Sequence, residues 1–491
     1  MTRTAYATQP LPRPVQPRRP HRTVHRWLVP LAAFAGALGL LYALLPGPQS
    51  GLPHAGKITL VVFAAAVLAW LSGKVDDTFV GLAAAVALVL AGVLSSGDLF
   101  AALGGETIWL LIAAFALAAG LTATGLPTRA AILLCARARS PRRLVHLVTA
   151  ALVGTALAVP ATSGRAALAL PVFLALATAL ADRPKLVKAL ALTFPTVILL
   201  SAVASLIGAG AHVITSTVLA TLTGSGISYG WWLLLGLPFA VVSSHLAAEL
   251  VLLLFTDRAT RVRPLRLDAD QLAAATGVGV RGPLTGAQWR ALAVLAGVVL
   301  LWCTESVHNL SPALVALLGA VLVTAPKVGT VTVSDAVDAV PWSLLLFMTT
   351  TTVLGAALST SGAAAWLGDA VFGGAAGSPL AVLALVVGVS TAAHLVLQSR
   401  SARSSVIVPL VVPLAMAAGM NPVALAFAST VAAGFCHTMP SSAKPVAMFA
   451  GTSAFGKADL LRVSAVLAPL FVLLVLGFAL AVWPAFGLAL R

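Results

Sequence analysis

Long apolar runs recur along the whole chain, and they constrain its fold more than any other feature. Several are long enough to cross a bilayer as a helix of about 20 residues, including residues 27–45, 231–255 and 461–483. Only 9% of the residues are charged, against about a quarter in a soluble protein. Strand-like alternation is absent, and in lipid the backbone must satisfy its own hydrogen bonds. The chain is therefore predicted to be an all-α polytopic membrane protein.

The net charge of +16 raises the question of nucleic acid binding. In residues 1–26, arginines alternate with prolines, which is typical of a disordered cytoplasmic tail near anionic lipid headgroups. The tail is long and no small-residue cleavage site follows the first apolar run, which disfavours a signal peptide. Cys135, Cys303 and Cys436 have no disulfide or zinc spacing. We expect membrane lipids as partners, no nucleic acid, no metal and no cofactor.

The apolar pattern predicts about 11 transmembrane helices and two re-entrant hairpins. The hairpins are expected at about 144–182 and 380–418, because each stretch is too long for one span and contains polar interruptions. The helices are expected at 27–46, 58–73, 79–95, 108–124, 190–222, 231–255, 287–303, 311–325, 343–359, 422–450 and 461–485.

The basic residues orient these helices. They concentrate in the tail and in alternate connections, around 129–143, 183–188 and 258–290. Cytoplasmic loops carry an excess of Lys and Arg. We therefore expect a multi-pass protein of the cell membrane with a cytoplasmic N-terminus. Counting either hairpin as a full span would invert much of the pattern, which favours the hairpin interpretation.

The two halves of the chain resemble each other at a nearly fixed offset. Asp98 and Asp335 are 237 positions apart, and Arg165 and Arg403 are 238 apart. Each half has five crossings, an odd number, which predicts an inverted repeat with a substrate site at the repeat interface. Chance similarity between Ala- and Gly-rich helices is the alternative. The predicted organisation is a tail at 1–26, an extra N-terminal helix and loop at 27–56, a first repeat at 57–255, a cytoplasmic linker at 256–286 and a second repeat at 287–491.

Four basic residues, Arg165, Arg400, Arg403 and Lys444, lie inside apolar segments. A charge at the centre of a membrane helix costs about 2.5–3.5 kcal/mol, and the predicted spans lack carboxylates to match. We expect an external anion to supply the negative charge. At the hairpin tips, helix N-termini and hydroxyl groups add donors. Alternatively, Arg165 and Arg403 bond backbone carbonyls, and Arg400 snorkels outward.

Two predicted helices are interrupted. Residues 205–215 contain Gly208 and Gly210 beside His212, and residues 434–445 contain two prolines, which break a helix. Freed backbone groups there can line a cavity. A membrane histidine is more often a packing residue, so His212 is a candidate with that alternative open. The candidate substrate-binding residues are Thr162, Ser163, Gly164, Arg165, His212, Ser401, Ala402, Arg403, Ser404 and Lys444.

The segment Trp302-Cys303-Thr304-Glu305, followed by Leu310-Ser311-Pro312-Ala313, resembles the divalent anion/sodium symporter family, the citrate- and dicarboxylate-transporter-like group. The resemblance covers about residues 57–485. It implies alternating access by an elevator-like motion, in a homodimer.

The family carries a Ser-Asn-Thr motif at each hairpin tip and a Thr-Pro-Pro-Asn-like motif in each broken helix, which together bind carboxylate and sodium. Here the tips read Ser163-Gly164-Arg165 and Ser401-Ala402-Arg403, so the serines match and arginines replace the threonines. His212 stands near the first Asn position and Lys444 near the second motif. We hypothesise that Arg165, Arg403 and Lys444 take the electrostatic role of sodium, since fixed positive charge repels a cation.

The leading hypothesis is a secondary transporter for di- or tricarboxylates or sulfate-like oxyanions, because Arg and Ser bind all of these anions. The alternative is a cation/proton antiporter or an arsenite-type permease of the wider superfamily, which needs intramembrane carboxylates. An enzyme is disfavoured because the sequence has no His-Glu-x-x-His pair and no G-x-S-x-G elbow. Glu249 and His245 have i, i+4 spacing, for which a helix-end hydrogen bond is the simpler explanation.

Overall fold

The computed structural model describes residues 36–46, 51–72, 74–372 and 378–491, and it divides into the units Met1–Pro46 and Gly47–Arg491. In the first unit, residues 36–44 are helical. The predicted tail and the start of the predicted helix at 27–46 lie outside the described residues. The described residues of the second unit form helices and turns without a strand.

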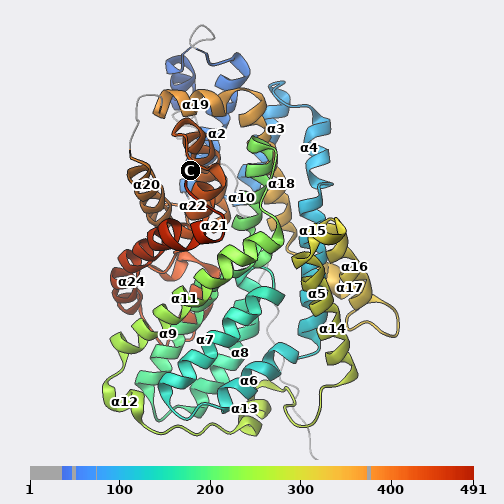
Figure 1. Cartoon of the computed structure of the whole chain (residues 1–491), viewed down its shortest axis with the longest axis vertical. Helices are drawn as coiled ribbons and strands as arrows, with labels where there is room; N and C mark the ends of the chain where they lie inside the picture. The colour runs from blue at the N-terminus through green and yellow to red at the C-terminus, as the bar shows by residue number, and fades with distance from the viewer. Residues whose placement is uncertain (1–35, 47–50, 73, 373–377) are drawn as a thin grey trace, which may run out of the picture. The chain divides into compact units, whose positions relative to one another are not determined.

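The first half of this unit contains the helices drawn from blue to green in Figure 1. They are α2 (His54–Ser72), α3 (Asp77–Leu90), α4 (Ser96–Leu103), α5 (Glu106–Ala123), α6 (Leu126–Ala136), α7 (Pro141–Ala158), α8 (Thr162–Ala179), α9 (Pro184–Leu200), the 3₁₀ turns η2 (Ser201–Ala204) and η3 (Leu206–Gly208), α10 (Gly210–Thr223) and α11 (Tyr229–Phe255). Two short helices follow, α12 (Arg258–Val262) and α13 (Ala269–Thr276).

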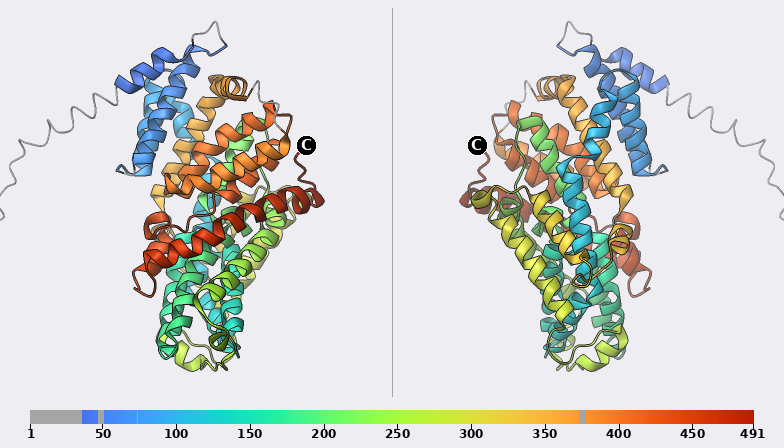
Figure 2. Two further views of the ribbon diagram at one scale, coloured as in Figure 1. Left: turned by 90° about the vertical axis from the view of Figure 1, so that its left-hand side faces the viewer. Right: turned by 90° about the vertical axis from the view of Figure 1, so that its right-hand side faces the viewer.

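The second half contains the helices drawn from yellow-green to red. They are α14 (Gly286–Cys303), α15 (Glu305–His308), α16 (Pro312–Thr324), α17 (Val333–Asp338), α18 (Trp342–Thr360), α19 (Ala363–Phe372), α20 (Pro379–Ala392), η4 (Ala393–Leu395), α21 (Arg400–Ala417), α22 (Pro422–Ala432), η5 (Pro440–Ser442), α23 (Lys444–Ala450), α24 (Lys457–Gly477), η6 (Phe478–Val482) and α25 (Trp483–Ala485). The long helix α24 runs obliquely across its neighbours and packs against α11 (Figure 2).

Nine helical segments among the described residues are long and apolar enough to cross a membrane. They are His54–Ser72, Ser96–Ala123, Thr162–Ala179, Pro184–Ala204, Tyr229–Phe255, Gly286–Cys303, Trp342–Thr360, Arg400–Ala417 and Lys457–Ala485. Large apolar side chains such as Leu90 and Leu473 are exposed on the outside, as lipid contact requires. The prediction of an all-α polytopic membrane protein is confirmed, and the number of crossings stays a prediction.

Both interrupted helices are broken where the sequence indicates. The first stretch unwinds after Leu200 into two 3₁₀ turns, and α10 begins at Gly210. The second unwinds after Ala432, and α23 begins at Lys444. Each break leaves backbone groups without their intrahelical partners, so they are open to other contacts.

Each predicted hairpin is a pair of helices, α7 with α8 and α20 with α21. Both ends of the first pair contact one segment, because the Leu265 amide donates to the Arg139 carbonyl at 3.0 Å and Arg183 Nη2 donates to the Pro264 carbonyl at 3.0 Å. The pair therefore leaves and returns to one end of the unit. That this end is one side of a membrane stays a prediction.

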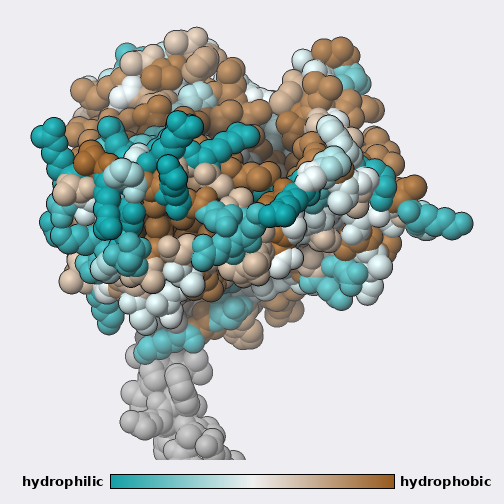
Figure 3. Space-filling view, turned by 90° about the horizontal axis from the view of Figure 1, so that it is seen from below, coloured by the Kyte–Doolittle hydropathy of each residue, from teal (hydrophilic) through white to brown (hydrophobic). Residues whose placement is uncertain are grey.

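Hydrophilic residues gather at the end of the unit where α12 and α13 lie (Figure 3). The connections around residues 137–143, 183–188 and 257–266 are rich in exposed basic side chains. Lys185 Nζ lies 2.7 Å from Asp257 Oδ2, which ties two of these connections together. The basic connections that the charge pattern assigns to the cytoplasmic side therefore lie together at the end of the unit that holds α12 and α13.

The arrangement of α8 and α21 is consistent with the predicted repeat. Each helix has 18 residues, and they begin 238 residues apart, at 162 and 400. Arg165 and Arg403 are each the fourth residue of their helix, and Pro171 and Pro409 lie inside. The inverted relation of the two halves stays a prediction.

Candidate functional site

A cavity of about 700 Å³ lies where both hairpins and both broken helices approach one another. The first residues of α8, α10 and α21 line it, together with the start of α3, one face of α18 and the junction of η5 with α23. Helix N-termini present free N–H groups and the positive end of the helix dipole. Three helices of 14 to 18 residues therefore begin at the wall of one cavity.

Among the residues of this wall, Arg403 is the strongest candidate for binding a ligand. Its side chain is 0% exposed, and Arg403 is among the residues that line the cavity. Nη1 donates to the Phe435 carbonyl at 3.2 Å, at the break after α22. Nε and Nη2 are buried and have no hydrogen-bond partner among the described residues. A buried cation with unused donors is costly unless a ligand pairs with it.

Arg400 also lines the cavity, so it does not snorkel away from the hairpin. Its Nη1 donates to the Leu199 carbonyl at 3.3 Å, which links the second hairpin to the first broken helix. Its Nε is buried without a partner in the described part of the chain. A Cβ on Gly434 would lie 2.6 Å from Arg400 Nη2 and 2.8 Å from the Val431 carbonyl oxygen, so a larger residue there would require a neighbour to shift. Arg400 and Arg403 also repel each other electrostatically.

Arg165 differs from Arg403 although it occupies the equivalent helix position. Its guanidinium donates to the Leu152 carbonyl at 2.6 Å, the Ile198 carbonyl at 3.0 Å, the Ser201 hydroxyl at 2.6 Å and the Thr155 hydroxyl at 3.0 Å. It is fully buried and is absent from the cavity lining. The carbonyl-bonding alternative therefore describes its geometry, and its substrate role stays a prediction.

Lys444 is the first residue of α23 and lines the cavity, but its side chain is exposed rather than deeply buried. The carboxylates of Asp76 and Asp77, at the start of α3, line the same cavity. Asp77 has electrostatic contact with Lys444 and with the hydroxyl of Ser399. The expectation that carboxylates are missing around the basic centre is therefore wrong, because α3 starts closer to the site than the sequence pattern places it.

The hairpin tips supply small polar groups to the wall. Thr162, Ser163 and Gly164 begin α8, and Ser401 is the second residue of α21. A Cβ on Gly210 would lie 3.0 Å from Ser401 Oγ, so the start of α10 approaches the second tip closely. These tips and the broken helices are thus held together as one site.

Three other predicted residues are absent from the cavity lining. His212 is fully buried, its Nδ1 lies 3.0 Å from the Ser205 carbonyl, and its ring stacks on Trp232 with centroids 4.9 Å apart. Ala402 and Ser404 are buried within α21. His212 therefore holds the break before α10 in place, and a direct substrate role for these residues stays a prediction.

Sequence reasoning missed several residues of the wall. Asp76, Asp77, Gln398, Ser399 and Cys436 all line the cavity. Asp76 and Asp77 lie in a segment that reads as a connection, Gln398 and Ser399 come just before the predicted second tip, and Cys436 lies within the second predicted break. The N-cap geometry of Asp76, which accepts from the Thr78 and Phe79 amides, could have placed the start of α3 correctly.

The sequence model described as the sodium:sulfate symporter transmembrane region matches residues 25–489. A protein of Cupriavidus necator described only as a membrane protein is 25% identical over 480 residues, covering 92% of this chain and 91% of that protein. The candidate malate transporter YflS of Bacillus subtilis is 31% identical over 102 residues, 21% of each chain.

Two solved structures share the fold. The YdaH transporter of Alcanivorax borkumensis aligns with a TM-score of 0.55 at 18% identity, covering 80% of this chain and 88% of that one. MtrF of Neisseria gonorrhoeae, described as illuminating a class of antimetabolite efflux pumps, aligns with a TM-score of 0.55 at 12% identity, covering 90% and 96%. The family match extends over the helices that build the cavity, and on this ground the chain belongs to the sodium:sulfate symporter family of membrane transporters.

Proposed function

We propose that this transporter moves small anions, di- or tricarboxylates or sulfate-like oxyanions, across the cell membrane by alternating access through the cavity at the hairpin tips. The observation that carries the proposal is Arg403. Two of its N–H groups are buried without a partner among the described residues, and Arg403 lines a cavity at whose wall three helices begin. An oxyanion is the ligand that such a guanidinium binds best, often through two parallel hydrogen bonds.

The size and polarity of the site suit a small polar anion. The hydroxyls of Ser163 and Ser401 and the guanidinium of Arg400 provide further donors around the same space. A dicarboxylate such as malate fits this donor set, and the partial match to a candidate malate transporter agrees with it. Sulfate, with the same demand for donors, is the next candidate.

Sodium-independent transport is part of the proposal. Fixed positive charge on Arg400 and Arg403 repels a cation from the tip of the second hairpin. The carboxylates of Asp76 and Asp77 lie at the start of α3, on another wall. We further propose a homodimer with a cytoplasmic N-terminus, in which the basic end holding α12 and α13 faces the cytoplasm.

The test is uptake by purified protein in liposomes, with radiolabelled malate, succinate, citrate and sulfate. We expect uptake of at least one anion, unchanged when sodium is replaced by choline at constant ionic strength. Arg403→Gln should abolish uptake while Arg281→Gln, an exposed arginine bound to Asp270, should leave it intact. Uptake that rises steeply with sodium would reject sodium independence, and normal uptake by the Arg403→Gln variant would reject the site.

One observation favours a second candidate, a cation/proton antiporter. Asp76 and Asp77 line the cavity, and antiporters need carboxylates that exchange a cation for protons. A pH gradient across the same liposomes separates the two functions. Dissipation of the gradient by sodium or lithium, without anion uptake, would favour the antiporter.

A further inference from the structure

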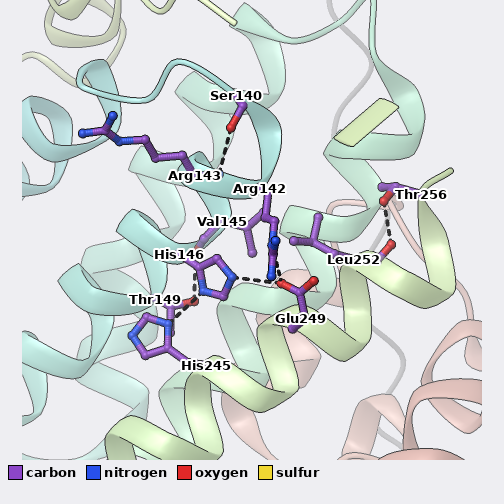
Figure 4. A network of polar contacts seen from close by, with 10 residues as sticks. All are labelled: Ser140, Arg142, Arg143, Val145, His146, Thr149, His245, Glu249, Leu252 and Thr256. Carbon is purple, nitrogen blue, oxygen red and sulfur yellow. Dashed lines mark hydrogen bonds and ion pairs between the residues drawn. The ribbon is translucent and has the colours of Figure 1, made fainter. Parts of the chain in front are cut away.

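A second cluster of titratable groups lies between α7 and α11, away from the cavity (Figure 4). His146 Nδ1 lies 2.9 Å from His245 Nδ1, and His146 Nε2 lies 3.0 Å from Glu249 Oε2. Arg142 Nε donates to the same carboxylate oxygen at 3.0 Å. The side chains of His146 and Glu249 are 30% and 27% exposed, so the cluster is partly sheltered but within reach of water.

The short contact between the two rings fixes how hydrogens are shared. Two Nδ1 atoms 2.9 Å apart hold one hydrogen between them, because two would clash and none would leave two lone pairs opposed. The Glu249 carboxylate only accepts, so His146 Nε2 carries a hydrogen. In the neutral pair His146 therefore has its hydrogen on Nε2, and His245 donates from Nδ1.

This arrangement accepts one further proton without breaking a contact. His245 Nε2 makes no hydrogen bond within the described part of the chain and carries a lone pair in the neutral pair. A proton bound there makes His245 an imidazolium. Transfer of the shared hydrogen to His146 Nδ1 then places the positive charge on His146, against Glu249, and leaves His245 neutral. Loss of a proton to water reverses both steps.

Charged residues on the other helices packed against α7 and α11 form no ion pair with His146, His245 or Glu249 in the described part of the chain. α12, which packs against α7, carries Arg258 and Arg261, and α24, which packs against α11, carries Arg462, whose guanidinium lies over the Phe255 ring. On α9, Lys185 and Lys188 bind Asp257 and Asp459. The groups that act electrostatically on Glu249 are Arg142 and His146, and the group that acts on His245 is His146. No metal-binding group of three such side chains occurs among the described residues.

We propose that His146 and His245 form a proton-binding site, backed by Glu249, that ties the first hairpin to α11 and makes transport depend on proton occupancy. α7 is the first arm of that hairpin, and the second arm, α8, carries Thr162, Ser163 and Gly164 to the cavity. A proton added at the base of the hairpin strengthens the contact between α7 and α11. The bound proton thereby biases where the tip of the hairpin lies. The effect on transport rests on the proposed function, whereas proton binding does not.

Proton binding is tested directly by ¹⁵N NMR of purified protein labelled in its histidine side chains. The resonances that disappear in His146→Gln and in His245→Gln should titrate together, as one step, between about pH 5 and 8. Glu249→Gln should move this step towards acid by about one pH unit, because the imidazolium loses its opposite charge. His308→Gln, whose ring binds the Leu301 carbonyl, is the control and should leave the step in place. Two independent steps, or none before unfolding, would overturn the proposal.

Transport is tested by anion uptake into liposomes across the same pH range. Wild type should change uptake several-fold, and His146→Gln should flatten the profile, since glutamine keeps a polar side chain but does not titrate. Uptake that varies with pH equally in both proteins would overturn the proposed coupling. Absence of uptake in the wild type at every pH would instead count against the proposed function, and the NMR titration would still decide the proton site.

Discussion

Replacing Arg165 by methionine should destabilise the protein far more than the same change at Arg403. Arg165 donates four hydrogen bonds, two of them to carbonyls of α7 and α9. A charged hydrogen bond contributes about 1.5–3 kcal/mol, but the buried charge itself costs several kcal/mol, so the four do not add. Its removal leaves acceptors unpaired at about 1–3 kcal/mol each, and we expect a net loss of roughly 3 kcal/mol.

Arg403 makes one hydrogen bond, at 3.2 Å, and keeps two buried donors unused. Methionine there removes about 1 kcal/mol of bonding and also removes the cost of those donors, so stability should change little. Transport should show the opposite order, because Arg403 faces the cavity. Thermal unfolding of both variants in detergent, followed by size-exclusion chromatography, measures the first effect, and uptake into liposomes measures the second. Equal losses of stability, or a stable and inactive Arg165→Met variant, would refute the division of roles.

Two further changes test local geometry. Gly210→Val should lower the melting temperature and uptake, since a Cβ already meets Ser401 Oγ at 3.0 Å and overpacking costs about 1–3 kcal/mol; unchanged uptake would contradict the close approach. The second change is Asp257→Asn. The Lys185 ammonium holds the pKa of Asp257 below its ordinary value of 3.8. The Asp257 carboxylate therefore stabilises the fold above pH 3.8, and this stabilisation is lost as the pH falls through the pKa of the folded state. The difference in melting temperature between wild type and variant should be small at pH 7 and vanish in acid, and a difference that grows in acid would contradict the sign.

Helix positions were predictable because lipid imposes a simple rule. Apolar length and breaks at glycine or proline decide where a membrane helix starts and ends, so the breaks before Gly210 and Lys444 follow from the sequence. Short helices such as α6 and α19 were not anticipated, since their lengths fall below a span. Their existence depends on packing against neighbouring helices, which composition does not encode.

The site was only partly predictable for a different reason. Rare intramembrane charges mark a functional region, and Arg403, Ser163 and Lys444 do line one cavity. The sequence does not say which way a guanidinium points. Arg165 donates four hydrogen bonds, whereas Arg403 donates one. The difference follows from the hydroxyls of Thr155 and Ser201, which lie beside Arg165 and accept from it. Asp77 was not anticipated, because in the sequence a residue of a connection cannot be told from a residue of a cavity wall.

Under the predicted repeat, Arg165 and Arg403 are equivalent residues with different hydrogen-bond partners. Each arginine donates to a backbone carbonyl at the adjoining break, Arg165 to Ile198 near the end of α9 and Arg403 to Phe435 in the break after α22. That shared contact anchors a hairpin tip to a broken helix, so both copies need it. Among the described residues, hydroxyls of Thr155 and Ser201 accept from Arg165, whereas none accepts from Arg403. Arg403 keeps two buried donors without a partner in the described part of the chain and lines the cavity, so under the proposed function these donors are available to an anion.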